Sequence, residues 1–270
     1  MKKLAPDKEH EISTIIEVSE LGFAYGGRRI IDNISCSFEE GCFTVILGKN
    51  GCGKSTFLRL ISGFLSPQEG IIALKGRNLQ TYSIRSLAQI QGYLPQQHHP
   101  VFPFSAMDVV LTGRAANIMF RPQNKDLEIA EEAIETLGIA HLKRRLFTEL
   151  SGGEQQLIML ARLLAQQPKV ILLDEPISHL DVAFQTRILE LLSRLTTEGI
   201  TVIAILHDPN LAQLYGDRFM CMENGTFLNR ADTRKISREH LEKIYEIEME
   251  TISDEGRTFY FPRKTAKFFG

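Results

Sequence analysis

Long apolar runs, a strong net charge and paired cysteines are all missing from this 270-residue sequence. Short runs such as TVIAIL (201–206) fall far short of the roughly 20 residues that span a bilayer, so work at a membrane would need a partner to supply the span. A formal net charge of −2 gives no sign of a nucleic-acid-binding surface, and no nucleic-acid partner is expected. The four cysteines form no CxxC pair, which fits free thiols in a reducing compartment, and the N-terminus lacks the apolar run of a signal peptide.

The second half of the chain alternates short apolar strands with helices. The pattern predicts strands over 169–173 and 201–206 and helices over 151–167, 182–197 and 209–215. Wholly apolar strands between helices indicate a parallel sheet that is covered on both faces. The fold class expected from this pattern is therefore α/β, with a mainly parallel sheet flanked by helices.

The segment GKNGCGKST (48–56) satisfies the pattern G-x-x-x-x-G-K-[ST] between an apolar strand and a helix predicted from Lys54 onward. Glycines let backbone N–H groups surround phosphates, and the helix N-terminus favours their charge. The pattern predicts that Lys54 reaches the β- and γ-phosphates of ATP and that Ser55 ligates Mg²⁺. The expected nucleotide-binding residues here are Gly48, Lys49, Asn50, Gly51, Cys52, Gly53, Lys54, Ser55 and Thr56.

Cys52 lies inside this glycine-rich loop. Its simplest role is that of a small filler. A second hypothesis is that the positive surroundings lower its pKa and make the thiol reactive.

Two further apolar strands end in polar residues. In VILLDEP, four apolar residues are followed by Asp174 and Glu175 and then by a proline that stops the strand. Asp174 is expected to be the acidic partner of Mg²⁺, and Glu175 the group that polarises an attacking water. His207 follows TVIAIL, and although a lone histidine is more often structural, this one also follows the carboxyl end of a strand, where open α/β sheets bind ligands.

The segment LSGGEQQ (150–156) opens a predicted helix. Ser151 and Glu154 form a capping box, which explains both residues structurally. Capping does not explain Gly152 and Gly153, whose backbone N–H groups are left open to an anion.

Taken in order with SHLD (178–181), these motifs resemble the ATP-binding subunit of an ABC transporter over roughly residues 14–235. The resemblance implies a P-loop NTPase core with an antiparallel β-subdomain and an inserted helical subdomain. The implied divisions are an N-terminal tail (1–13), the first part of the ATP-binding core with the β-subdomain (14–95), the Q-loop and helical subdomain (96–150), the second part of the core (151–235), and a C-terminal helix, β-pair and tail (236–270).

The same resemblance assigns roles within a homodimer that holds two ATP molecules at its interface. Each ATP is expected between residues 48–56 of one chain and Ser151, Gly152, Gly153 and Glu154 of the other. Gln96 matches a residue that touches Mg²⁺ and the attacking water, Asp181 one that communicates across the dimer, and His207 one that contacts the γ-phosphate. Tyr25 matches an aromatic that stacks on adenine, although an ordinary strand aromatic explains it equally well. The implied catalytic residues are Glu175, His207, Gln96 and Lys54, and the implied metal ligands are Ser55, Gln96 and Asp174.

YLPQQ, DVVLTGR and the segment 236–263 are similar to the subfamily that powers import of ferric siderophores, haem and cobalamin. That similarity implies an ATPase at the cytoplasmic face of the membrane, with transmembrane permease subunits as partners and a substrate-binding protein acting indirectly. Importers of molybdate, tungstate or a metal ion share these features and stay open as alternatives. A soluble ABC protein that acts on DNA or ribosomes is a weaker alternative, because the chain lacks sustained heptads and has one P-loop. A small-molecule kinase would not explain LSGGE or SHLD.

The segment QQHHPVFPF (96–104) begins with Gln96 of the expected ATP site and leads into the expected helical subdomain. Its adjacent histidines point to opposite sides of an extended chain and have no evident third ligand, so a metal site is not expected. Its apolar residues Val101, Phe102 and Phe104 are candidates for permease docking or for packing within the helical subdomain.

Overall fold

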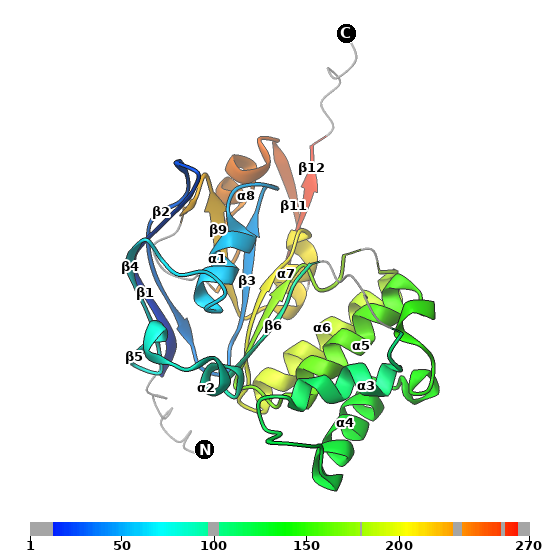
Figure 1. The fold of residues 1–270 in the computed structure, drawn as a ribbon. Helices are drawn as coiled ribbons and strands as arrows, with labels where there is room; N and C mark the ends of the chain where they lie inside the picture. The colour runs from blue at the N-terminus through cyan, green and yellow to red at the C-terminus, as the bar shows by residue number, and fades with distance from the viewer. Residues whose placement is uncertain (1–12, 97–102, 179, 229–233, 255–256, 264–270) are drawn as a thin grey trace, which may run out of the picture.

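The computed structural model describes residues 13–96, 103–178, 180–228, 234–254 and 257–263. Nearly all of the predicted N-terminal tail lies outside these residues, as do residues 97–102 with the two histidines, Val101 and Phe102. At the centre is a six-stranded sheet in the order β10-β9-β3-β8-β7-β6, parallel except for the edge strand β10 (Figure 1). Its strands are β3 (Phe43–Gly48), β6 (Gln91–Leu94), β7 (Val170–Asp174), β8 (Thr201–Ile205), β9 (Arg218–Glu223) and β10 (Thr226–Phe227). The predicted α/β fold with a mainly parallel sheet is confirmed.

Both faces of this sheet are covered, which is why its central strands are mostly apolar. Every residue of β3, β7 and β8 is buried. Successive strand residues point to opposite faces, so Val45 joins one core cluster and Ile46 the other. Helices α3 to α7 contribute to the first cluster, and α1 with an antiparallel sheet contributes to the second.

The antiparallel sheet has the order β2-β1-β4-β5 and lies on the opposite side of the molecule from the helical region in Figure 1. Gly26 and Gly27, both with positive φ, make the tight turn between its two long strands. This sheet is the antiparallel β-subdomain that the resemblance implied. Its strands are β1 (Thr14–Tyr25), β2 (Arg28–Glu39), β4 (Glu69–Leu74) and β5 (Arg77–Asn78).

The helices predicted over 182–197 and 209–215 are confirmed with the same bounds. The predicted helix over 151–167 is shorter at its end, where Gln167 adopts a left-handed backbone, and the one predicted from Lys54 stops before Gly63, which has positive φ. In the described ranges, no helix is both long and apolar enough to cross a bilayer. The helices are α1 (Lys54–Ile61), α2 (Ile84–Ala88), α3 (Ala106–Leu111), α4 (Asn124–Thr136), α5 (Gly152–Ala165), α6 (Val182–Thr197), α7 (Pro209–Tyr215) and α8 (Arg238–Tyr245).

After α8, the chain forms a two-stranded antiparallel hairpin of β11 (Met249–Asp254) and β12 (Arg257–Pro262). The predicted last helix and β-pair are therefore present. Helix α8 packs beside β9, and β12 packs beside α7 (Figure 1). The C-terminal segment thus lies against the parallel sheet.

A buried ion pair ties the helical region together. The Arg114 guanidinium lies 3.1 Å from the Asp126 carboxylate, and their side chains are only 6% and 12% exposed. A second guanidinium nitrogen donates to the Ala165 carbonyl at 3.0 Å, near the end of α5. This arginine therefore joins α5 to the start of α4.

Replacing Arg114 with alanine should lower the free energy of unfolding by about 3 kcal/mol, because the Asp126 carboxylate would stay buried without its partner. Arg194→Ala, in an exposed pair with Glu198, should change it by only about 0.5 kcal/mol and is the matched control. Urea denaturation of both variants measures the difference. Similar losses in the two variants would contradict the interpretation.

Candidate active site

Three loops far apart in sequence meet at one edge of the parallel sheet. In the strand register, Ile46 of β3 and Asp174 of β7 both lie beside Ile205 of β8. Gly48 ends β3, and Glu175 and His207 lie in the loops that follow β7 and β8. The carboxyl ends of parallel strands share one edge, so the register brings together the residues that the sequence pattern selected.

A hollow of about 410 Å³ opens at this edge. Loop residues from 50–56 line one part of it, and Gln96 and Glu175 line another. Ile30 of β2, which the sequence pattern did not indicate, is also in the lining. The structure therefore brings the glycine-rich loop, Gln96 and Glu175 to a single cavity.

Glycine is required at two places in the loop. Gly53 has φ of 111°, and a Cβ there would lie 2.9 Å from the Ile30 carbonyl. At Gly48, a Cβ would lie 2.5 Å from the Met222 carbonyl. Gly53 is also the N-cap of α1 and supplies no capping side chain, so the first N–H groups of the helix are free of a side-chain cap. Such a helix start suits a phosphate group.

Lys54 folds back over the loop. Its Nζ donates to the Gly48 carbonyl at 2.7 Å and to the Lys49 carbonyl at 2.8 Å. Burial lowers the pKa of Lys54, since the charged form loses solvation. The ammonium group is held by neutral carbonyls at the floor of the hollow, close to where phosphates would bind.

Ser55 and Asp174 meet beneath the hollow. The Ser55 hydroxyl donates to Asp174 Oδ1 at 2.9 Å, and the Tyr93 hydroxyl lies 3.4 Å from Oδ2. Burial raises the pKa of Asp174, and the bond from Ser55 opposes that shift. A carboxylate, a hydroxyl and the nearby Gln96 amide supply the hard oxygen ligands that Mg²⁺ prefers, so these residues fit the ion.

The described residues contain no cluster of three or more histidine, cysteine or acidic side chains that could hold a metal. Any Mg²⁺ at Ser55 and Asp174 would therefore need water or substrate phosphates to complete its coordination. Such partial coordination by protein is usual for Mg²⁺ in nucleotide sites.

Glu175 receives three hydrogen bonds. Gln96 Nε2 and His207 Nε2 each donate at 2.7 Å, and the Ser178 hydroxyl donates at 3.1 Å. Burial alone would raise the pKa of Glu175, but these bonds outweigh it and hold the pKa below its usual range. The carboxylate is therefore charged at neutral pH and can accept a proton.

The backbone of Glu175 is in the left-handed region, with φ of 54°. A non-glycine residue in a sparsely populated backbone region costs about 1 to 3 kcal/mol and persists where its surroundings over-determine it, often at functional sites. Here the turn moves the side chain off the strand direction, away from Asp174 and toward Gln96 and His207.

The remaining predicted residues lie elsewhere in the chain. Ser151 and Glu154 form the predicted capping box of α5, with Ser151 N–H donating to the Glu154 carboxylate at 2.8 Å. Asp181 caps α6 by accepting from the Phe184 N–H at 2.9 Å. Tyr25 is 45% exposed at the tip of the β1–β2 hairpin, in edge contact with the Phe23 ring. In the described part of the chain, none of these residues lines the hollow.

The hypothesis of a lowered pKa at Cys52 is wrong. Burial raises the pKa of this thiol, and the charge of Lys54 opposes the shift only in part. Nearby positive charge was visible in the sequence, whereas the loss of solvent around the thiol was not.

No sequence pattern indicated a role in the site for Ser178, Tyr93 or Ile30. Ser178 is three residues after Glu175, and its N–H closes a turn onto the Glu175 carbonyl at 3.2 Å. That short spacing was a usable signal. Tyr93 reaches the site through the pairing of β6 with β7, and Ile30 through the packing of β2 against Gly53, and neither contact has a local sequence pattern.

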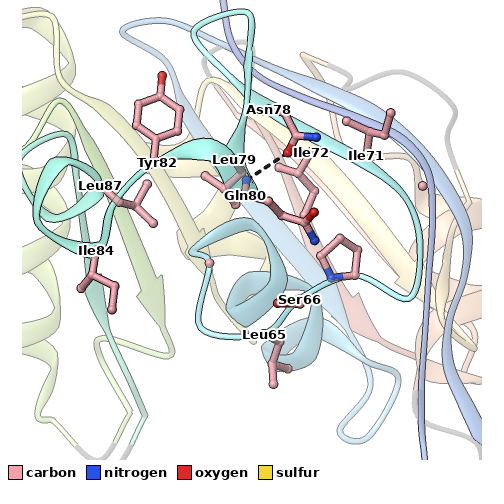
Figure 2. A pocket seen from close by; sticks show the side chains of 13 residues that line it. Leu65, Ser66, Ile71, Ile72, Asn78, Leu79, Gln80, Tyr82, Ile84 and Leu87 are labelled. Atoms are coloured by element: carbon pink, nitrogen blue, oxygen red, sulfur yellow. Dashed lines mark hydrogen bonds between the residues drawn. The ribbon is translucent and has the colours of Figure 1, made fainter.

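An apolar surface surrounds α2, away from the hollow. A groove of about 410 Å³ between α2 and α5 is lined by Phe64, Ile84, Leu87, Tyr93, Met159 and Leu163, among others. We call it the α2 groove. Figure 2 shows the adjoining pocket, with Ile84 and Leu87 on one side and Ile72 of β4 on the other. Phe64 is 70% exposed and Ile84 is 91% exposed, so a contiguous apolar surface faces outward.

Comparison with known proteins agrees with this geometry. The family model described as ABC transporter matches residues 31–178. A hemin import ATP-binding protein, HmuV of Bradyrhizobium diazoefficiens, is 34% identical over 261 residues, which cover 93% of this chain and 96% of HmuV. A solved structure of a metal-chelate type ABC transporter in an inward-facing conformation superposes with a TM-score of 0.80 at 31% identity, over 93% of this chain and 98% of that one. The dimeric bacterial ABC transporter cassette MJ0796 superposes with a TM-score of 0.74 at 25% identity, over 83% and 100%. The chain therefore belongs to the ABC transporter family, as one of its ATP-binding subunits.

Proposed function

We propose that the chain hydrolyses ATP to power import of a metal chelate, with haem as the first candidate. The observation that carries the hydrolysis is the Glu175 carboxylate, which accepts bonds from Gln96, His207 and Ser178 beside the glycine-rich loop. Support for the cargo comes from the hemin import relative and the metal-chelate type neighbour. Siderophores and cobalamin are chelates of the same class.

The proposed reaction uses the groups that meet at the hollow. Backbone N–H groups of the loop and the Lys54 ammonium would hold the phosphates, and Ser55 and Asp174 would hold Mg²⁺. When bound, Mg²⁺ would neutralise charge on the phosphate oxygens. Glu175 would accept a proton from the attacking water, while Gln96 orients that water and His207 contacts the γ-phosphate. The low pKa of Glu175 keeps it available as a proton acceptor at neutral pH.

A second copy of the chain would complete each site. Gly152 begins α5 at an exposed position, with open space where a side chain would be, and the N–H groups there are available to an anion. Because Ser151 to Glu154 do not line the hollow of their own chain, we infer that they close the site of the partner chain. The dimeric cassette among the structural neighbours supports this arrangement. Tyr25 would stack on adenine, and Asp181 would lie at the dimer contact.

A transmembrane permease would bind the α2 groove at the cytoplasmic face of the membrane. Phe64 and Ile84 expose apolar surface there, and the groove runs between the core and the helical region, so a docked segment would sense movement of both. Phe104 is 53% exposed and remains a candidate for the same contact. A substrate-binding protein would act through the permease.

Glu175→Gln should retain ATP binding and lose turnover by at least about 100-fold, because an amide cannot accept the proton from water. Glu190→Gln makes the same chemical change at an exposed position of α6 and should keep normal turnover. Phosphate release and nucleotide binding by the purified variants measure both effects. Normal turnover in Glu175→Gln would refute its role as the base.

A growth assay tests which substrate the transporter imports. Cells whose copy carries Glu175→Gln should fail to grow with haem as the sole iron source, because uptake would lack its energy supply, and should retain molybdate-dependent growth. Uptake of labelled haem checks the result directly. Normal use of haem together with a molybdate defect would favour the oxyanion alternative.

Ile84→Asp should reduce recovery of the multi-spanning permease with the chain by about tenfold or more, because a charge would enter an apolar contact. Hydrolysis by the isolated subunit should stay unchanged. Ile252→Asp, at a 59% exposed position of β11, is the matched control and should leave recovery intact. Equal recovery with both variants would exclude the α2 groove as the docking surface.

A further inference from the structure

The end of helix α8 contacts two loops of the ATP site. Helix α8 packs beside β9, and Lys243 pairs with Glu223 at the end of that strand, at 3.0 Å. Figure 1 shows α8 on the same end of the molecule as the start of α1. Its last residue and the one after it, Tyr245 and Glu246, both reach residues next to the hollow.

Tyr245 contacts the loop after β8. Its hydroxyl donates to the backbone carbonyl of His207 at 2.9 Å. The ring packs against the main core, which restricts where the hydroxyl can lie. Burial raises the pKa of Tyr245 to about 12, so the hydroxyl keeps its proton and remains a donor at neutral pH.

Glu246 contacts the glycine-rich loop. Its carboxylate lies 2.7 Å from the Lys49 ammonium. Glu246 has φ of 54°, a left-handed backbone that ends α8 and lets two successive residues point to different loops. Both members of this pair are exposed, so the ion pair contributes less to the geometry than the bond from Tyr245.

The hairpin β11–β12 contacts the helix that follows the same loop. Asn210, in the first turn of α7, donates from its amide to the Tyr260 carbonyl at 3.0 Å and accepts from the Tyr260 N–H at 2.8 Å. The C-terminal segment therefore holds the His207 carbonyl through Tyr245 and the start of α7 through Tyr260. The His207 imidazole in turn donates to the Glu175 carboxylate at 2.7 Å.

We propose that Tyr245 is a positioning residue for ATP hydrolysis, which holds the His207 backbone so that the imidazole stays on Glu175. This inference rests on the proposed roles of Glu175 and His207. It gives the C-terminal segment a part in the reaction, since a hydroxyl on α8 fixes one of the groups around the water-activating carboxylate. Tyr245 itself does not line the hollow.

The test compares two tyrosines whose hydroxyls each donate to one backbone carbonyl. Tyr245→Phe keeps the ring and removes the bond to His207, whereas Tyr82→Phe removes a hydroxyl that donates to the Leu74 carbonyl at 2.9 Å, beside the antiparallel sheet. In the full-length purified chain, Tyr245→Phe should lower kcat about fivefold, the size expected for one lost hydrogen bond, with KM for ATP within about twofold. Tyr82→Phe should leave kcat within about twofold. Equal kcat in the two variants, or a parallel loss of ATP binding in Tyr245→Phe, would overturn the proposal.

A double variant shows whether Tyr245 acts through His207 or through a general loss of stability in the C-terminal segment. In single-turnover measurements on His207→Ala, adding Tyr245→Phe should cause no further loss, because the imidazole it positions is gone. A full fivefold loss in both backgrounds would overturn the proposal. Glu175→Gln, measured in parallel, separates failure of the proposed function from failure of this proposal. If Glu175→Gln turns over normally, the proposed function fails. If it is inactive while Tyr245→Phe matches Tyr82→Phe, only the role of Tyr245 fails.

Discussion

The parallel pairing of β3, β8 and β7 is the constraint on which the rest of this structure depends. Each strand is buried at every position, and the register places Ile46 and Asp174 beside the same residue of β8. Because parallel strands end at one edge, loops separated by more than a hundred residues along the chain meet there. The pairing of these buried strands thus fixes where the polar residues of the site lie.

Two consecutive carboxylates at this edge have opposite electrostatic environments. Burial raises the pKa of Asp174 at the end of β7, whereas three hydrogen bonds hold the pKa of Glu175 below its usual range. The left-handed backbone at Glu175 separates them, since it moves the second carboxylate out of the strand and into the loop. Asp174 therefore faces Ser55 at the proposed metal site, whereas Glu175 faces Gln96 and His207, where the proposed base would meet water.

The single chain holds only part of the proposed site. Gln96, Glu175 and the glycine-rich loop share one hollow, but the Ser151 end of α5 does not line it. The start of α5 is exposed, and a side chain at Gly152 would meet open space, so this end of the helix is accessible to the ATP of the proposed partner chain. The proposed dimer and the proposed permease contact both follow from surfaces that the fold leaves uncovered, at the start of α5 and at the α2 groove.

The sequence by itself determined the elements and the residues whose signal is local. The predicted strands and helices of the second half, the capping box at Ser151 and the glycine-rich loop before Lys54 follow from spacing, glycine placement and strand ends, because these depend on contacts within a few residues. Only the tertiary structure decided the direction of the pKa shift at Cys52, the contact from Tyr93 to Asp174 and the hydrogen bond from Tyr245 to His207. Solvent exclusion and partners from distant strands and helices set these, and a linear sequence carries no local signal for either.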